Sequence, residues 1–284
     1  MDVLFAFALT LFAGVSTGIG SLIAFFSKKN NHNFLAITLG FSAGVMLYVS
    51  MIEILDKANT SISSELGENL AGWITALAFF LGMIFIAILD KLLPKEKDVY
   101  QLSSNKKKKQ YIKNSKLNVA VGFDDVNSKT ARKKAKLLRI GVFTAVAIAI
   151  HNFPEGLATF MSALQDASIA IPIAVAIALH NIPEGIAVAM PVYYATGNRK
   201  KAFWLSFASG LTEPLGAIIG YLILLPIMSD LVFGIIFAGV AGMMVFISLD
   251  ELLPSAREYG KPYLSIYGLI GGMVIMAVSL LLFM

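Results

Sequence analysis

The chain has 284 residues, of which 57% are hydrophobic and only 14% are charged, and its mean hydropathy is +0.75. Soluble domains carry about 25% charged residues, so this composition argues against a water-soluble globule. The 23 Lys and Arg residues outnumber the 18 Asp and Glu residues, and cysteine is absent, which excludes both disulfides and thiolate metal ligands.

Eight apolar stretches follow one another along the chain, each close to the roughly 20 residues that a helix needs to cross a bilayer. Transmembrane strands would be nearer to about ten residues long and alternate in polarity, so we predict an all-α integral membrane protein with eight transmembrane helices. The first stretch has no preceding basic residue and no cleavage site, so we expect a retained helix rather than a signal sequence. The stretches lie at about Val3–Phe26, Phe34–Leu55, Leu70–Leu93, Ile140–Leu164, Ser168–Ala195, Phe203–Pro226, Leu231–Leu253 and Tyr263–Met284.

Between the third and fourth stretches, residues 94–138 are polar and rich in lysine, with four in a row at Lys106–Lys109. This composition predicts a flexible loop in a single transmembrane domain, 1–284. A solvated tether explains the charge better than a nucleic-acid or lipid site, so we assign no nucleic-acid partner. Anionic lipid headgroups would still attract the loop weakly.

Basic residues predict how the helices are oriented. With eight helices, 22 of the 23 Lys and Arg residues fall on one side of the membrane and only Lys57 falls on the other. The positive-inside rule makes the first side cytoplasmic, so both termini are expected outside the cell membrane. A wrong helix count would scatter these charges, so their segregation supports the number eight independently of hydropathy.

The fourth and fifth stretches each contain the sequence His-Asn-x-Pro-Glu-Gly, at His151–Gly156 and at His180–Gly185. His and Glu at i and i+4, with Asn between them, project from one face of a helix. Proline lacks an N–H, so we expect a kink and a free carbonyl, which membrane proteins tolerate beside a cavity. A single intramembrane His is more often an interhelical hydrogen-bond partner than a ligand, but two copies of the motif favour a metal site.

Three glutamates lie well inside apolar stretches, although charged side chains there cost free energy. No Lys or Arg lies within a helix core to neutralise them, so a divalent cation, or protonation in its absence, would have to compensate. Two His, two Asn and three Glu exceed what one four-coordinate zinc needs, so two adjacent metal positions bridged by two of the glutamates are expected. The candidate ligands are His151, Asn152, Glu155, His180, Asn181, Glu184 and Glu213, the last on the sixth stretch before Pro214.

The second and seventh stretches resemble each other. Ala43–Leu55 aligns without gaps onto Ala241–Leu253, with six identities in thirteen positions. The two helices would run in opposite directions, so the likeness predicts an inverted-repeat transporter bundle. Its binuclear metal site would lie between helices four, five and six.

On these residues the chain resembles the ZIP family of metal transporters (Zrt/Irt-like proteins), and within it the bacterial zinc transporters. His-Asn-x-Pro-Glu-Gly is highly specific to that family, and the likeness covers essentially the whole chain. It implies one metal position formed by His151, Glu155, His180 and Glu184, and a second formed by Asn152, Glu155, Asn181, Glu184 and Glu213.

The resemblance also implies a function: uptake of divalent metal ions into the cytoplasm, chiefly zinc, with a selectivity that can include iron, manganese, cobalt and cadmium. The metal would be the transported substrate rather than a catalytic cofactor, and the transporter would often be a homodimer. Many relatives have a His-rich long loop, whereas this loop contains no His, so metal buffering by the loop is not expected.

Two other functions are considered. An intramembrane metalloenzyme is disfavoured, because zincin proteases place Glu directly after His, whereas Asn follows here and Pro interrupts the motif. A passive metal channel stays open as an alternative to a carrier. Glu53, Asp250 and Glu251 could assist ions at the mouths of the pathway, although solvation of helix ends explains them equally well.

Overall fold

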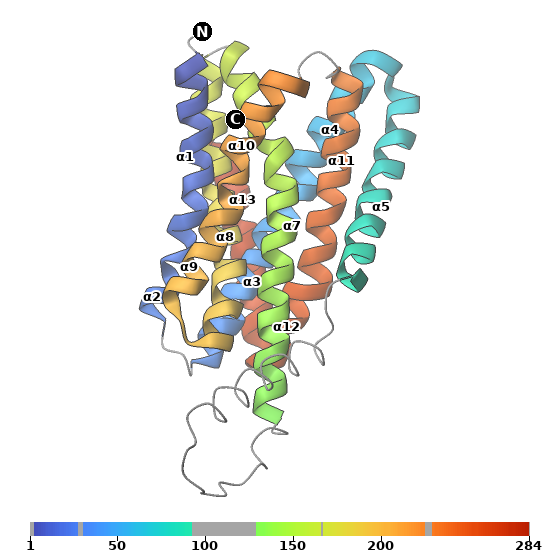
Figure 1. The fold of residues 1–284 in the computed structure, drawn as a ribbon. Helices are drawn as coiled ribbons and strands as arrows, with labels where there is room; N and C mark the ends of the chain where they lie inside the picture. The colour runs from blue at the N-terminus through green and yellow to red at the C-terminus, as the bar shows by residue number, and fades with distance from the viewer. Residues whose placement is uncertain (1–2, 28–30, 93–128, 166, 225–228, 284) are drawn as a thin grey trace, which may run out of the picture.

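The computed structural model describes residues 3–27, 31–92, 129–165, 167–224 and 229–283, and within these ranges the ordered elements are helices (Figure 1). Three short segments are wound as π-helix, with one extra residue per turn, and carry the label η. The elements are α1 (Val3–Ser21), α2 (Ile23–Phe26), α3 (His32–Val49), η1 (Ser50–Ile54), α4 (Leu55–Leu66), α5 (Glu68–Leu92), α7 (Lys129–Gln165), α8 (Ala167–Thr196), α9 (Arg199–Gly210), α10 (Thr212–Ile219), η3 (Gly220–Leu224), α11 (Asp230–Phe246), η5 (Ile247–Leu252), α12 (Leu253–Tyr259) and α13 (Pro262–Phe283).

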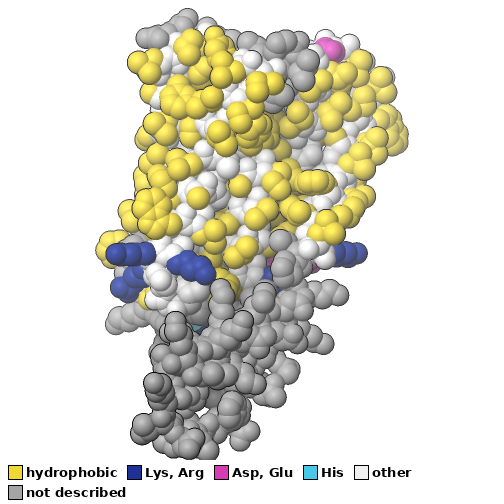
Figure 2. Space-filling model, in the orientation of Figure 1, with side chains coloured by type: hydrophobic (Ala, Val, Ile, Leu, Met, Phe, Trp, Pro, Cys, Tyr) yellow, Lys and Arg dark blue, Asp and Glu magenta, His cyan; other side chains and the backbone are white. Residues whose placement is uncertain are grey.

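Among the described residues, eight helical spans are long and apolar enough to cross a membrane, which confirms the predicted number. Several consist of consecutive elements, as where α3, η1 and α4 run on as one span over His32–Leu66. Apolar side chains cover most of the visible face, and Lys and Arg gather near one end of it (Figure 2). We call this end, where α5 ends and α7 begins, the loop end, and the opposite end, where α1 begins and α13 ends, the terminus end (Figure 1).

The fourth membrane-crossing helix begins earlier than the sequence predicted. Residues 94–128 lie outside the described residues, but residues 129–138 form the first turns of α7 instead of loop. Lys, Arg, Ala and Leu dominate this stretch and are strong helix formers. The turns are also held from outside, since Lys136 Nζ lies 2.5 Å from Glu258 Oε2 and the Tyr259 hydroxyl donates to the Lys133 carbonyl at 2.8 Å.

The spans pack as two groups. The first, which we call the motif bundle, contains α1, α7, α8 and the α9–α10 span, with α8 packed on both α1 and α7 and α10 packed on α7. The second, the flanking bundle, contains the α3–α4 span, α5, the α11–α12 span and α13, with α3 on α13 and α5 on α11. The two bundles meet where α3 packs on α8 and where α7 touches α11 and η5.

The inverted repeat is visible in how the helices pack. η1 and η5 fall at matching places of the two aligned segments, and α4 ends at the terminus end whereas α12 lies at the loop end (Figure 1). Gly44 in the second span contacts the Leu269 carbonyl of the eighth, and its counterpart Gly242 in the seventh contacts the Phe79 carbonyl of the third. The contact between the second and eighth spans thus matches the contact between the seventh and third spans. An inverted repeat relates the two halves in this way, so the fold is an inverted-repeat transporter bundle.

Candidate metal site

The two sequence motifs lie in the middle of long helices, as predicted. α7 continues through Pro154 and α8 continues through Pro183. Neither proline can donate a hydrogen bond, so the carbonyls of Ile150 and Leu179 lose the partners that an unbroken helix would give them. The Pro183 carbonyl is itself used, because the buried Ser42 hydroxyl of α3 donates to it at 2.7 Å.

The glycine that ends each motif allows another helix to come very close. A Cβ on Gly156 would collide with the backbone of Glu213 in α10, and a Cβ on Gly185 would collide with the backbone of Thr17 in α1. A facing helix, rather than a hydrated ion, therefore occupies the space that these glycines leave. Because Gly156 admits α10, the third glutamate reaches the two motifs.

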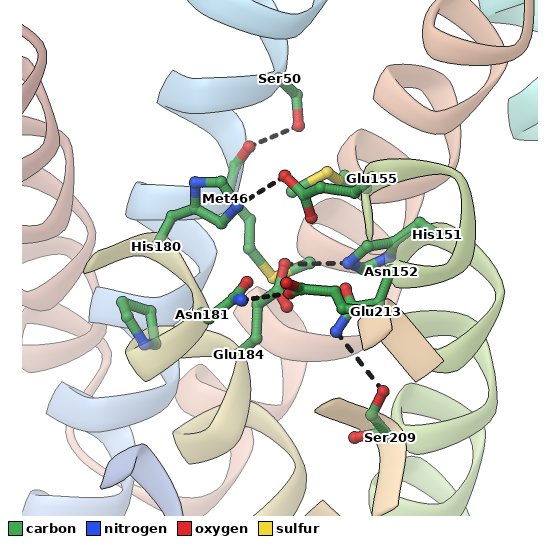
Figure 3. Close-up of polar contacts among 12 residues, drawn as sticks. Met46, Ser50, His151, Asn152, Glu155, His180, Asn181, Glu184, Ser209 and Glu213 are labelled. Atoms are coloured by element: carbon green, nitrogen blue, oxygen red, sulfur yellow. Dashed lines mark hydrogen bonds and ion pairs between the residues drawn. The ribbon is translucent and has the colours of Figure 1, made fainter. Parts of the chain in front are cut away.

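The imidazole of each motif contacts the carboxylate of the other (Figure 3). His151 Nε2 lies 2.9 Å from Glu184 Oε1, and His180 Nε2 lies 2.8 Å from Glu155 Oε1. Two ligands of one tetrahedral zinc, each about 2.0 Å from the ion, would be separated by roughly 3.3 Å. Each pair is thus already close to the separation of neighbouring metal ligands.

The two asparagines of the motifs form further contacts, with Glu213 and with backbone carbonyls of neighbouring helices. The Asn181 amide donates to Glu213 Oε1 and, at 2.9 Å, to the Ala13 carbonyl of α1. The Asn152 amide donates to the Ser209 carbonyl at 3.5 Å, while its other end lies 3.0 Å from His151 Nε2 and 3.2 Å from Glu184 Oε2. The seven predicted residues therefore form three contacting groups, which lie together in Figure 3: His151 with Asn152 and Glu184, His180 with Glu155, and Asn181 with Glu213.

This cluster is buried, and several of its polar atoms have no hydrogen-bond partner. The seven side chains are buried, with Glu155 the most exposed at 7%. Five polar atoms of these seven residues have no hydrogen-bond partner within the described structure: His151 Nδ1, both ring nitrogens of His180, Asn181 Oδ1 and Glu213 Oε2. Buried polar atoms without partners are costly, so these atoms point to something that the protein alone does not supply.

The charges of the three site glutamates are not matched by basic side chains. Among the described residues, the ion pairs of Lys and Arg go to other carboxylates, namely Glu53, Glu258, Asp90 and Glu251. Among the described residues, the contacts of the Glu155, Glu184 and Glu213 carboxylates are with imidazoles and amides. Nor are three His, Asp or Glu side chains of the described ranges gathered closely enough to hold a metal ion in this conformation. Binding therefore requires the two His–Glu pairs to open toward a shared ion.

A cavity of about 380 Å³ leads from the cluster toward the terminus end. Glu155 and His180 lie at its inner part, and α7 lines it further with Ala158, Thr159 and Ser162. The polar wall opposite comes from η1 and α4: Glu53, Asp56, Lys57, Thr60 and Ser61. The sequence analysis considered Glu53 for the mouth of the ion pathway but did not single out its polar neighbours. Their recurrence along one helix could have indicated a polar wall.

Comparison with known proteins gives the family. Residues 1–280 match the family model described as "ZIP Zinc transporter". Proteins named "Zinc transporter ZupT" are 59% identical in Streptococcus mutans serotype c, over 98% of this chain and 97% of theirs, and 57% identical in Clostridium perfringens, over 99% and 97%. Another of that name, from Lysinibacillus sphaericus, is 54% identical over 99% of this chain and 98% of its own. The chain therefore belongs to the ZIP family of zinc transporters.

Proposed function

We propose that this protein takes up zinc across the bacterial cell membrane, with the buried cluster of the motif bundle as the binding site for the ion. The observation that carries the proposal is the cluster of three buried glutamates without a basic partner, two of them paired crosswise with the two imidazoles. A dication resolves this imbalance of charge, and histidine with carboxylate is a common zinc ligand set.

Two metal positions are proposed within the cluster. The crosswise pairs support the first, formed by His151, Glu155, His180 and Glu184. The contacts of the Asn181 and Asn152 amides with glutamates support the second, formed by Asn152, Glu155, Asn181, Glu184 and Glu213. Two dications against three carboxylates leave a net charge of +1, which favours release over tight capture, as transport requires.

The predicted orientation and the position of the cavity support uptake as the direction of transport. The positive-inside rule assigns the loop end to the cytoplasm, where the basic residues gather. The cavity reaches Glu155 and His180 from the terminus end, which would then face outward. Zinc would lose part of its water against the Glu155 oxygens, open the His–Glu pairs and leave toward the loop end after the two bundles move relative to each other.

Nitrogen and oxygen ligands without sulfur accommodate several first-row ions, so ferrous iron, manganese and cobalt, and also cadmium, are proposed as further substrates. Competition with zinc uptake in reconstituted vesicles would rank them. A carrier is preferred to a channel because the cavity ends at buried, paired side chains rather than in a continuous pore. The homodimer implied by the sequence stays a prediction.

Zinc uptake into proteoliposomes tests the proposal. Glu155→Ala combined with Glu184→Ala should abolish saturable uptake, because both metal positions lose their bridging oxygens. Glu68→Ala is the matched control, since Glu68 is an exposed carboxylate in the first turn of α5. Undiminished uptake by the double variant would refute the site. Flux that neither saturates nor shows counterflow would instead indicate a channel.

A further inference from the structure

Arg139 of α7 connects the two bundles at the loop end. Its guanidinium donates to the Asp90 carboxylate, to the Asp90 carbonyl at 3.1 Å and to Glu251 Oε1 at 3.3 Å. Asp90 belongs to α5 and Glu251 to η5, both in the flanking bundle, whereas Arg139 belongs to the motif bundle. A planar guanidinium holding two carboxylates and a carbonyl fixes geometry in a way that a single lysine would not.

The connection lies along the part of α7 that leads away from the cavity. Arg139 precedes His151 by twelve residues, which is roughly 18 Å along a helix. Between them, α7 buries Phe143, Thr144 and Ile148 completely. Glu155 and Thr159, on the other side of His151, line the cavity. The metal site is thus reached by a cavity from the terminus end and faces packed side chains toward the loop end.

The inverted repeat supplies an internal comparison. In the alignment of the second and seventh spans, Glu53 of η1 corresponds to Glu251 of η5. Glu53 Oε1 also has a basic partner, Lys57 Nζ, at 2.7 Å. Lys57 lies one turn further along the same helix and its side chain is 49% exposed, so this pair joins nothing to the motif bundle. Of the two equivalent glutamates, the one beside the cavity is paired locally and the one at the packed end is paired across the bundles.

We propose that Arg139, with Asp90 and Glu251, is a latch that holds the loop end of the metal pathway closed by tying α7 to the flanking bundle. The contacts of the latch do not depend on the proposed transport function. Its role does rest on that function, since the metal ion would leave past this point. Opening requires α7 to separate from α5 and η5, so that water hydrates the partly buried groups that the ion pairs now hold together.

Because the chain has no cysteine, a single introduced cysteine can report which end of the pathway is open. Thr144→Cys places the reporter on α7 between Arg139 and the metal site, at a fully buried position. A membrane-impermeant thiol reagent is applied to inside-out and right-side-out membrane vesicles without zinc. Adding Arg139→Gln should raise the labelling rate at this position at least tenfold from the loop end and leave labelling from the terminus end unchanged.

Three further variants guard the test against simple unfolding. Lys57→Gln breaks the equivalent local pair and should leave labelling at residue 144 unchanged. Arg139→Glu should open the loop end, and combining it with Glu251→Arg should restore slow labelling, because the exchanged charges can pair again. Equal labelling with and without Arg139→Gln, or no recovery in the charge exchange, would overturn the latch. Labelling needs no transport, so loss of the proposed function would appear separately, in zinc uptake by the Glu155 and Glu184 variants.

Discussion

The motif bundle and the flanking bundle fill their interiors in different ways. The motif bundle buries two imidazoles, two amides and three carboxylates around the crosswise His–Glu pairs. Glycines bring backbones together in both bundles, as Gly156 does in the motif bundle and Gly44 does in the flanking bundle. Among the described residues of the flanking bundle, however, Glu251 is the only buried carboxylate. Close packing of small residues stabilises helix association in lipid, whereas buried charge opposes folding unless a ligand offsets it. The comparison indicates that the motif bundle provides the ligands for an ion, whereas the flanking bundle provides mainly packing contacts.

The largest effect expected from this contrast is on binding. Glu184→Gln keeps the shape of a fully buried side chain but removes a charge shared by both proposed metal positions. Zinc uptake at low zinc concentration should fall at least about tenfold, which corresponds to roughly 1.4 kcal/mol. Thermal unfolding without zinc should change little, because glutamine has nearly the same shape as glutamate and can still form a hydrogen bond with His151. A lower melting temperature with normal uptake would show instead that Glu184 serves stability and not zinc binding.

A second effect, on stability and not on uptake, is expected in the flanking bundle. Gly44→Ala places a methyl group against the Leu269 carbonyl, whereas Gly72→Ala on α5 meets no atom within 4 Å. The first change should cost about 1–3 kcal/mol of unfolding free energy, as overpacking typically does. The second should gain about 0.5–1 kcal/mol, because alanine is the better helix former. Melting temperatures measured in one detergent compare the two directly, and equal shifts would argue against tight packing at Gly44.

The smallest effect is expected where the flanking bundle faces the cavity. Lys57 and Glu53 form a half-exposed pair of the kind that contributes about 0.2–1 kcal/mol. Lys57→Gln should lower the KM for zinc, because a cation leaves the cavity wall, but by less than about fivefold. Uptake measured at several ionic strengths checks this, since salt should reduce the difference. A large loss of maximal rate would show that Lys57 does more than repel the ion.

Much of this organisation could be predicted from sequence. Hydropathy and the distribution of lysine and arginine gave eight helices, and the repeated motif identified the residues of the cluster, because charged groups in apolar helices need compensation wherever they lie. The crosswise pairing could not be predicted, since it depends on how α7 and α8 pack. Arg139 lay at the boundary between the predicted loop and the fourth apolar stretch, and its pairing could not be predicted because its partners Asp90 and Glu251 come from segments distant in sequence.

The π-helical turns have a further consequence. Each extra residue changes the angular phase of a helix by about 100°, so residues before and after the turn face directions that uninterrupted α-helix would not give them. In the span formed by α3, η1 and α4, Ser42 faces Pro183 of α8, while Asp56 and Thr60 beyond η1 line the cavity. Shortening Ser50–Ile54 by one residue would rotate the polar wall away from the pathway while leaving its composition intact. An indel of a single codon at this place would therefore be far more damaging than most substitutions around it.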